Sequence, residues 1–177
     1  MNRSSFLFAA FLLAVSFAAA RAEDPPKPSP ELKILGRMVG TWDEVLTNKP
    51  TEWIPTANRS TSITKKSWAL DNRFVKMEGV WNPAKTEFVS YAAFDPATKE
   101  YRQWYFDASG VMPRGNTRGT WDERTKTINW TGTDESGNKT ISKTRYIDDD
   151  THEWTVVTTD PKGKVVLDLH GKNTRRK

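Results

Sequence analysis

Hydrophobic and polar residues alternate along most of the chain after Gly40, with the two-residue period of a β-strand. Turn sequences, each beginning with an aspartate, interrupt this alternation every 12 to 15 residues. The aspartates that begin them are Asp95, Asp107, Asp122, Asp134, Asp148 and Asp160. Aspartate side chains bond their own downstream backbone, and the prolines and glycines nearby preset turn dihedral angles. The pattern therefore predicts short antiparallel strands joined by tight turns.

The segments between these turns are rich in β-branched and aromatic residues, which favour strands. Ten strands are predicted, at residues 40–48, 61–70, 73–81, 87–94, 100–106, 114–121, 126–133, 139–147, 152–159 and 164–170. An open sheet of this size would leave two exposed edges, and closure of the sheet removes both. We therefore expect an all-β fold, an up-and-down antiparallel barrel of about ten strands.

Before the first strand, the spacing of apolar residues becomes that of a helix. Leu32, Leu35 and Met38 recur every third residue, and Pro30 suits the first helical position. Ser29 is placed to cap the helix, and a glycine follows its end. We expect a short amphipathic helix over Pro30–Met38 whose apolar side plugs one end of the barrel.

The first 22 residues have the pattern of a secretory signal peptide. Arg3 precedes an apolar and small-residue run over residues 6–20, which is short of the roughly 20 apolar residues of a membrane span. Ala20 and Ala22 occupy the two positions that a signal peptidase reads. We expect cleavage after Ala22 and a secreted or periplasmic protein. Its parts would be the signal peptide at 1–22, a proline-rich tether at 23–30 and a single barrel domain at 31–177.

Composition narrows the choice of partners. Cleavage would lower the formal net charge from +5 to +3, because Arg3 and Arg21 are lost. The chain has no cysteine, so the fold does not depend on disulfides. Aromatic and basic residues alternate over residues 101–106, as in platforms that stack single-stranded nucleic acid. The modest charge and the expected export argue against a nucleic-acid partner.

Few residues support catalysis or cofactor binding. There is no Gly-x-Ser-x-Gly motif, and the two histidines, His152 and His170, lie on predicted strands where a surface or packing role is the default. The alternation of Val165, Leu167 and Leu169 gives the inner face to aliphatic residues and sends His170 outward, which disfavours a haem ligand. We expect no catalytic residue, no metal and no cofactor, and an enzyme is the second alternative to the leading hypothesis below.

The segment Gly-Thr-Trp-Asp-Glu occurs twice, at residues 40–44 and 119–123. The first copy begins a predicted strand and the second ends one, so the two are not an internal duplication. The first copy, Gly40-x-Trp42 directly after a helix, with Arg175 and Arg176 near the C-terminus, resembles the lipocalin-like (calycin) superfamily. The resemblance implies that Trp42 lies across a closed end of the barrel, beneath Arg175 or Arg176, with a cation over the indole face.

A second resemblance covers about residues 29–176. Leu35-Gly36 through Gly40-Thr41-Trp42, the stretch YAAFDPATKEYRQWYFDASG and the terminal TRRK look like a secreted bacterial family, domain-of-unknown-function family 1579. This resemblance implies the fold. It implies no biochemical role, because none is settled for that family.

A ten-stranded barrel has more interior space than its own side chains need, so it can hold a small molecule. The expected ligand-binding residues are Met77, Arg102, Trp104, Phe106, Trp130, Arg145 and Trp154. The period alone leaves two strands open. The opposite register of residues 100–106 would place Tyr101, Gln103 and Tyr105 inside. The opposite register of residues 139–147 would place Ser142, Thr144 and Tyr146 inside.

The leading hypothesis is a secreted, non-enzymatic barrel that binds a small apolar or amphipathic molecule in its interior. An amphiphile would lie with its tail inside and its anionic head at Arg102, near the rim. The first alternative is a barrel with a filled core that acts through its surface as an envelope structural or interaction module. No nucleic acid and no membrane span are expected, and the oligomeric state is left open.

Overall fold

The computed structural model describes residues 29–110 and 117–177. The predicted signal peptide, most of the predicted tether and the start of the predicted sixth strand lie outside the described residues. The described part contains one short helix, α1 at Leu32–Gly36, followed by ten strands. The strands are β1 Gly40–Asn48, β2 Arg59–Ala69, β3 Phe74–Trp81, β4 Thr86–Asp95, β5 Glu100–Asp107, β6 Thr117–Asp122, β7 Thr127–Thr133, β8 Lys139–Tyr146, β9 Thr151–Thr159 and β10 Val165–Arg175.

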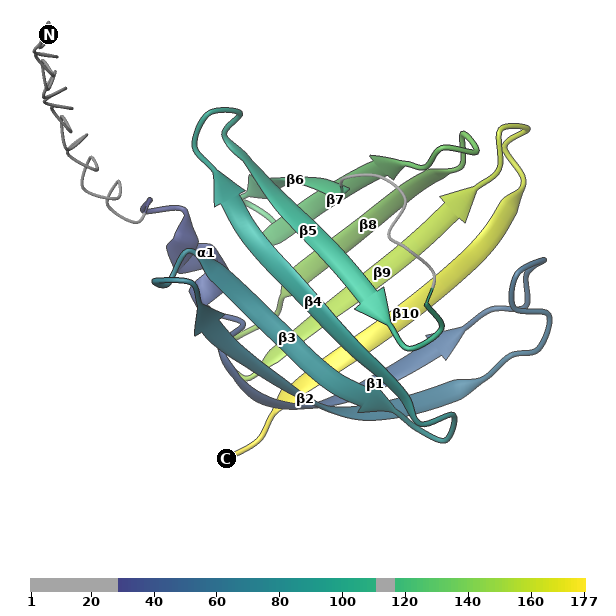
Figure 1. Ribbon diagram of the computed structural model, residues 1–177, viewed down its shortest axis with the longest axis horizontal. Coiled ribbons are helices and arrows are strands. Elements are labelled where there is room, and N and C mark those ends of the chain that lie inside the picture. Colours follow the sequence, from purple (N-terminus) through teal and green to yellow (C-terminus); the bar gives the residue numbers. More distant parts are fainter. Residues whose placement is uncertain (1–28, 111–116) are drawn as a thin grey trace, which may run out of the picture.

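The ten strands form a closed antiparallel barrel in which each strand pairs with its neighbours in sequence (Figure 1). Closure comes from β1 and β10, which pair from Trp42 opposite Arg175 to Asn48 opposite Leu169. The prediction of an all-β, up-and-down, ten-stranded barrel is therefore confirmed. The pairing of the first strand with the last removes the two edges that an open sheet would expose, the benefit from which closure was inferred.

Two differences in extent from the predictions matter most for the closed end of the barrel. β10 runs to Arg175, five residues beyond the predicted end at 170. Its polar end, from Gly171, lacks a strand-like composition but finds ladder partners on β1 and β9. The helix is shorter than predicted, and Glu31, not Ser29, occupies its N-cap position without a side-chain cap. Ser29 instead accepts the backbone N–H of Leu32 on its carbonyl oxygen, at 3.0 Å, in the turn before the helix.

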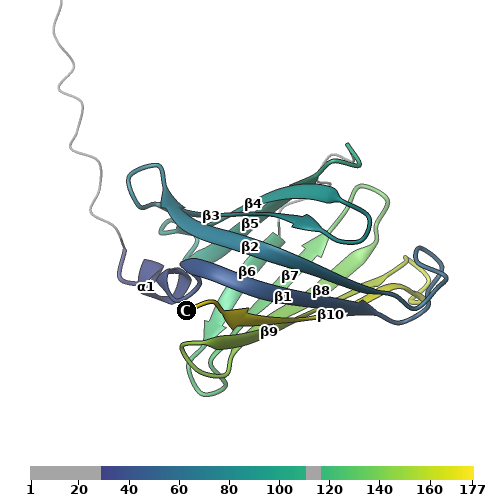
Figure 2. The same cartoon turned by 90° about the horizontal axis from the view of Figure 1, so that it is seen from below.

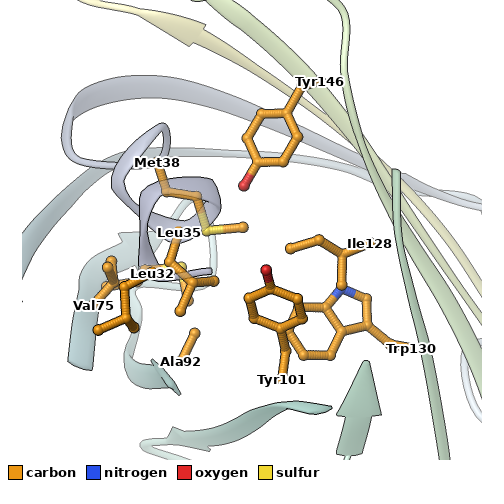
Figure 3. Close-up of a cluster of buried hydrophobic side chains, with 10 residues drawn as sticks. Leu32, Leu35, Met38, Val75, Ala92, Tyr101, Ile128, Trp130 and Tyr146 are labelled. Atoms are coloured by element: carbon orange, nitrogen blue, oxygen red, sulfur yellow. The ribbon is translucent and has the colours of Figure 1, made fainter. Parts of the chain in front are cut away.

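Helix α1 lies at one end of the barrel (Figure 2). Leu32, Leu35 and Met38 belong to the buried core cluster (Figure 3). The other members of the cluster are Val75, Met77, Ala92, Tyr101, Ile128, Trp130 and Tyr146. Two tyrosines attach the helix by hydrogen bonds as well: the Tyr101 hydroxyl donates to the Glu31 carbonyl at 3.1 Å, and the Tyr146 hydroxyl donates to the Ile34 carbonyl at 3.2 Å.

Trp42 and Arg175 meet at the same end, across the β1–β10 pairing. Trp42 is 1% exposed, and its indole N–H donates to the Met38 carbonyl at 2.6 Å. The Arg175 guanidinium carbon lies 4.2 Å from the centre of the Trp42 ring. The same guanidinium donates to the carbonyls of Val39 and Arg37, at 2.6 and 3.1 Å, on the segment that leaves α1. Arg175 thereby ties helix, first strand and last strand together.

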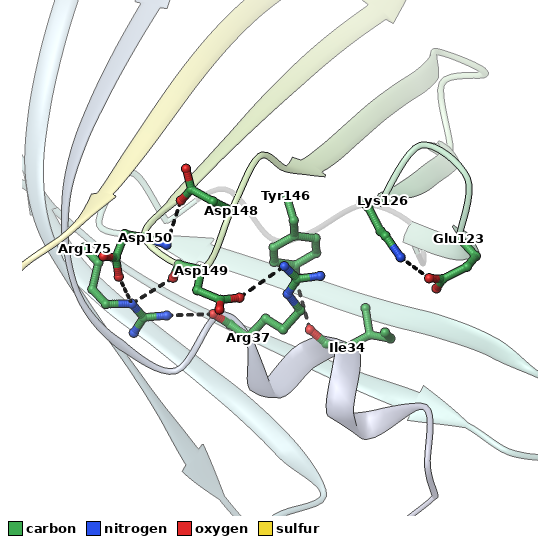
Figure 4. A network of polar contacts seen from close by, with 9 residues as sticks. All are labelled: Ile34, Arg37, Glu123, Lys126, Tyr146, Asp148, Asp149, Asp150 and Arg175. Carbon is green, nitrogen blue, oxygen red and sulfur yellow. Dashed lines mark hydrogen bonds and ion pairs between the residues drawn. The ribbon is translucent and has the colours of Figure 1, made fainter.

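Arg176 has a different position. Its guanidinium pairs with the Asp43 carboxylate on the outer surface, at 2.9 Å. Of the two arginines named from the sequence, Arg175 is therefore the one over the indole. On the other side, Arg175 contacts the turn before β9, where it donates to the Asp149 carbonyl at 3.0 Å and pairs with Asp150 at 3.2 Å (Figure 4).

Gly40 makes this arrangement possible. Its φ of +139° is rarely adopted by residues with a side chain, and a Cβ atom there would collide with the Arg175 guanidinium. The Gly-x-Trp pattern thus has a local cause: glycine leaves room for the arginine that covers the tryptophan.

Candidate functional site

The barrel encloses a cavity of about 460 Å³, within the range of sites that hold small molecules. It extends from Met38, Lys66 and His152 at the α1 end to Trp81, Tyr105 and Leu167 at the opposite end. Tyr105 is 41% exposed while it lines the cavity, so the cavity reaches solvent at the end opposite α1. We refer to the α1 end of the cavity as its base and to the opposite end as its rim.

Another hollow, of about 500 Å³, lies beside β6, β7 and β8. Its lining consists of outward or rim side chains such as Arg118, Lys139 and Ile141, the last of which is 60% exposed. It has no aromatic wall and no buried charged group. The interior cavity is therefore the better candidate, although the two volumes are similar.

Three aromatic rings form one wall near the rim. Trp81 and Phe88 are stacked with centres 5.2 Å apart, and Phe88 and Tyr105 are stacked at 5.7 Å. The Trp81 indole N–H donates to the Tyr105 hydroxyl at 3.3 Å, which closes the row. Burial raises the pKa of Tyr105 to about 12, so the hydroxyl is neutral at physiological pH. A flat apolar molecule can stack against such a surface.

The remaining walls are of two kinds. Across the cavity, β1, β9 and β10 contribute the aliphatic side chains of Leu46, Val156, Leu167 and Leu169. Strands β6 and β8 contribute hydroxyl groups, from Thr117, Thr140, Ser142 and Thr144. The cavity is therefore apolar on two sides and offers hydrogen-bond donors and acceptors on a third.

Buried polar side chains gather at the base. The Lys66 ammonium donates to His152 Nε2 and to Asn173 Oδ1, both at 3.0 Å. Asn173 in turn donates from Nδ2 to Glu44 Oε1 at 3.0 Å. All four residues are buried, with Lys66 5% and His152 2% exposed. The strands β1, β2, β9 and β10 thus each supply one member of a network that the barrel closure assembles.

Neutral donors satisfy the Glu44 carboxylate. Besides Asn173, Oε1 accepts the Trp154 indole N–H at 2.6 Å, and Oε2 accepts the Thr64 hydroxyl at 2.7 Å. The Trp154 indole reaches this position because Gly171 lies under it, where any Cβ atom would overlap the ring. Three hydrogen bonds from fixed groups hold the carboxylate in place on the cavity wall.

The two basic groups of the base have depressed pKa values. The pKa of Lys66 is lowered to about 8, mainly by burial; the Glu44 charge opposes this change and the Arg175 charge adds to it. Burial, with the nearby charges of Lys66 and Arg175, lowers the pKa of His152 to about 2. At pH 7 Lys66 is therefore mostly charged and His152 is neutral. Because Nε2 accepts from an ammonium, the proton of the neutral ring lies on Nδ1, which has no hydrogen-bond partner among the described residues.

Three of the residues named from the sequence line the cavity, namely Met77, Trp130 and Trp154. Trp130 is buried beside Gly119, and its indole N–H donates to the Thr144 hydroxyl at 3.0 Å. Met77 belongs both to the core cluster and to the cavity wall. Their position is compatible with ligand contact.

The register expected for β5 is wrong. Gln103 and Tyr105 line the cavity and Tyr101 is buried at its α1 end, so Arg102, Trp104 and Phe106 point outward. Arg102 pairs with Glu100 at 3.3 Å and with Asp95 at 3.6 Å. Trp104 contacts the Phe74 ring, and Phe106 is 36% exposed. The inner face is decided by the hydrogen bonds of Tyr101 to α1 and of Gln103 to Ser90.

Arg145 is also outside. Its guanidinium pairs with Glu153 on the neighbouring strand at 3.2 Å. Ser142 and Thr144 line the cavity and Tyr146 is buried, so β8 has the second of the two registers that the sequence left open. Val165 is exposed too, because a bulge at the start of β10 shifts the alternation between Val165 and Leu167.

The buried polar residues at the base of the cavity were not predicted from the sequence. Glu44 is two residues after Trp42, and His152 is two residues before Trp154, so each shares an inner face with a tryptophan. The inward orientation of Glu44 and His152 could therefore have been predicted from their two-residue spacing to these tryptophans. His152 is buried, the packing role of the two expected for it, while His170 lies outside and bonds Asp168 at 2.8 Å. The burial of Lys66 and Asn173 could not be predicted, because β2 is polar on both faces and the end of β10 lacks a strand-like composition.

The described residues contain no group of three or more histidines, aspartates and glutamates arranged to hold a metal ion. Within the same part of the chain, no helix is both long enough and apolar enough to cross a bilayer.

The fold is shared with proteins of very different sequence. The S-type phycobiliprotein lyase CPES from Guillardia theta is 13% identical over 82% of this chain and 92% of its own, with a TM-score of 0.58. A redesigned β-barrel, mFAP1, is 14% identical over 83% of this chain and 100% of its own, with a TM-score of 0.40. A search of curated proteins gave no match.

A family model also matches most of the chain. Residues 27–175 match the family described as a protein of unknown function, DUF1579. The matched range contains all ten strands of the barrel. It also contains Gly40, Trp42 and Arg175, which meet at the closed end. The chain is a lipocalin-like antiparallel barrel and belongs to the DUF1579 family.

Proposed function

We propose that this protein binds a small apolar or amphipathic molecule inside its barrel. The observation that carries the proposal is the cavity of about 460 Å³, open at the rim, with stacked aromatic rings on one wall and buried charged groups at its base. A barrel whose only task was structural would gain stability by filling this volume, since unfilled space forfeits packing contacts. Likeness to the lyase at 13% identity supports the fold alone, so the cavity itself bears the argument.

The walls favour a flat molecule of mixed polarity. Trp81, Phe88 and Tyr105 offer ring faces for stacking, and the hydroxyl wall of β6 and β8 offers hydrogen bonds to polar edges. None of these groups forms a nucleophile–base pair on the cavity surface, so the geometry supports binding better than catalysis.

The test is a titration with a neutral apolar dye, Nile red, and with a panel of small aromatic compounds, followed by dye and tryptophan fluorescence. A cavity-filling variant, Ser142→Phe, should abolish saturable binding because Ser142 lines the cavity. The matched control is Lys143→Phe, at the next position of the same strand, where the side chain points outward and is exposed. Equal binding by both variants, or no binding by the wild-type protein after removal of any copurified molecule, would refute interior binding.

We further propose that the protein is exported and works outside the cytoplasm, after cleavage following Ala22. The support is the basic residue, apolar run and Ala-x-Ala pattern of the first 22 residues. Mass spectrometry of the intact protein recovered from its host tests this. A chain beginning at Glu23 is expected, and one that retains residues 1–22 in the envelope fraction would contradict it.

A further inference from the structure

Lys66 is a buried cation whose hydrogen-bond partners are both neutral. Its ammonium group donates to His152, which is neutral, and to the side-chain amide of Asn173. Among the described residues, no carboxylate forms an ion pair with Lys66, although ion pairs are common on the barrel surface. A buried charge is costly unless an opposite charge or sufficient hydrogen bonds compensate for it. The Lys66 charge therefore has two hydrogen bonds but no directly paired negative charge among the described residues.

Glu44 does not fill that place directly. Asn173 lies between the two groups, accepting from Lys66 on Oδ1 and donating to Glu44 from Nδ2. Glu44 is already bonded by Trp154 and Thr64 as well. The amide therefore keeps ammonium and carboxylate apart, and the Glu44 charge acts on Lys66 only at longer range.

An ammonium group has three N–H donors, and the protein uses two of those on Lys66. The ammonium also lies 5.4 Å from the centre of the Trp42 ring, which accepts no conventional hydrogen bond, and Lys66 is part of the cavity lining, so the remaining donor can reach a molecule inside the barrel. Arg175 lies over the Trp42 ring and adds a second positive charge near the base, where it lowers the pKa of Lys66. The base of the cavity thus suits an anion.

The rim has the opposite charge. Asp107, at the end of β5, is part of the lining there, and among the described lining residues Lys66 is the one that carries a positive charge at pH 7, since His152 is neutral. Arg102, the residue expected to hold an anionic head at the rim, points outward and is paired with acidic residues. Charge therefore disfavours an anion at the rim and favours one at the base.

We propose that the molecule held in the barrel carries a carboxylate, which binds the Lys66 ammonium at the base while the apolar body lies against the Trp81–Phe88–Tyr105 wall. This inference rests on the proposed interior binding and specifies the chemistry of that same site. The orientation is carboxylate first, the reverse of the tail-in arrangement expected from the sequence.

The experiment compares naphthoic acid with its methyl ester, two molecules of nearly equal shape, by isothermal titration calorimetry at pH 7. The acid should bind about 10- to 100-fold more tightly, the range expected for one charge-assisted hydrogen bond in a buried site. In Lys66→Met the advantage of the acid should disappear while the ester still binds. The matched control is Lys65→Met, because Lys65 is exposed on the outer face of the same strand and should leave the advantage unchanged.

A second measurement uses only the wild-type protein, so it tests the proposal even if Lys66→Met does not fold. In the wild-type protein, affinity for the acid should fall as pH rises beyond the pKa of Lys66, near 8 in the free protein and higher in the complex. Affinity for the ester should stay constant over the same range. Equal affinity for acid and ester would overturn the carboxylate proposal and leave interior binding intact. Failure of both molecules and of Nile red to bind would overturn interior binding itself.

Discussion

The guanidinium carbon of Arg175 lies 4.2 Å from the centre of the Trp42 ring, and the two residues are directly opposite each other in the β1–β10 ladder. One strand therefore presents the indole and its partner presents the cation that covers it. The same ring is in T-shaped contact with the His152 ring, with centres 4.5 Å apart. Trp42 is thus the contact between the closed end of the barrel and the polar base of the cavity.

Replacement of Trp42 by alanine should lower the free energy of unfolding by about 3–5 kcal/mol, because a fully buried ring would leave a cavity. Trp121→Ala is the control, since it belongs to the other Gly-Thr-Trp-Asp-Glu copy. Trp121 is only partly buried and donates its indole N–H to Glu123 at the surface, at 2.7 Å. Its loss should cost clearly less in denaturant melts, and equal costs would mean that the two copies have equivalent roles.

Much of the fold could be predicted because turn residues and strand composition are local properties. The register of β5 could not, because both faces of residues 101–106 carry aromatic rings. Its inner face is decided by Tyr101, whose hydroxyl reaches the Glu31 carbonyl 70 residues earlier in the chain. The polar base was hidden for a similar reason: Lys66 follows Lys65 in a strand that is polar on both faces. Only barrel closure shows which lysine is buried.

The two C-terminal arginines should differ sharply in their contribution to stability. Arg175→Met removes hydrogen bonds to the carbonyls of Val39, Arg37 and Asp149, and it leaves the partly buried carbonyls of Val39 and Arg37 unsatisfied. We expect a loss of about 2–4 kcal/mol. Arg176→Met removes one surface ion pair with Asp43 and should cost less than about 1 kcal/mol. Chemical denaturation of both variants checks the order, which similar losses would contradict.

Stability should depend on pH through His152. Its pKa is about 2 in the folded protein against 6.5 for an ordinary histidine, so below pH 6.5 the unfolded chain binds a proton that the folded protein does not. Protonation therefore favours unfolding, and the stabilisation present above pH 6.5 is lost as pH falls, at a rate approaching about 1.4 kcal/mol per pH unit.

This prediction is tested by urea denaturation of the wild-type protein and of His152→Gln at several pH values between 7 and 4. The difference in slope between them isolates the histidine from the carboxylates, which titrate in both proteins. His170→Gln is the control, because His170 is exposed and bonded to Asp168. A wild-type slope no steeper than that of His152→Gln would show that the buried ring accepts a proton in the folded state.

Gly171→Ala should disturb the cavity wall without replacing any polar side chain. The new Cβ atom would overlap the Trp154 indole, which must move and give up its 2.6 Å hydrogen bond to Glu44. We expect a destabilisation of about 1–3 kcal/mol, typical of overpacking, together with a shift of the tryptophan emission. Lys172→Ala, at the next and outward-facing position, should change neither quantity. An unchanged emission spectrum in Gly171→Ala would show that the indole has room to stay in place.

The members of the polar base come from the first two strands and the last two, β1, β2, β9 and β10. During synthesis, Glu44 and Lys66 leave the ribosome 129 and 107 residues before Asn173, the amide that joins them. The polar base is therefore completed only when β10 is made, because Asn173 separates Lys66 from Glu44 and the pairing of β10 with β1 closes the barrel. Closure of the barrel and assembly of the polar base are thus one event, set by the arrival of the final strand.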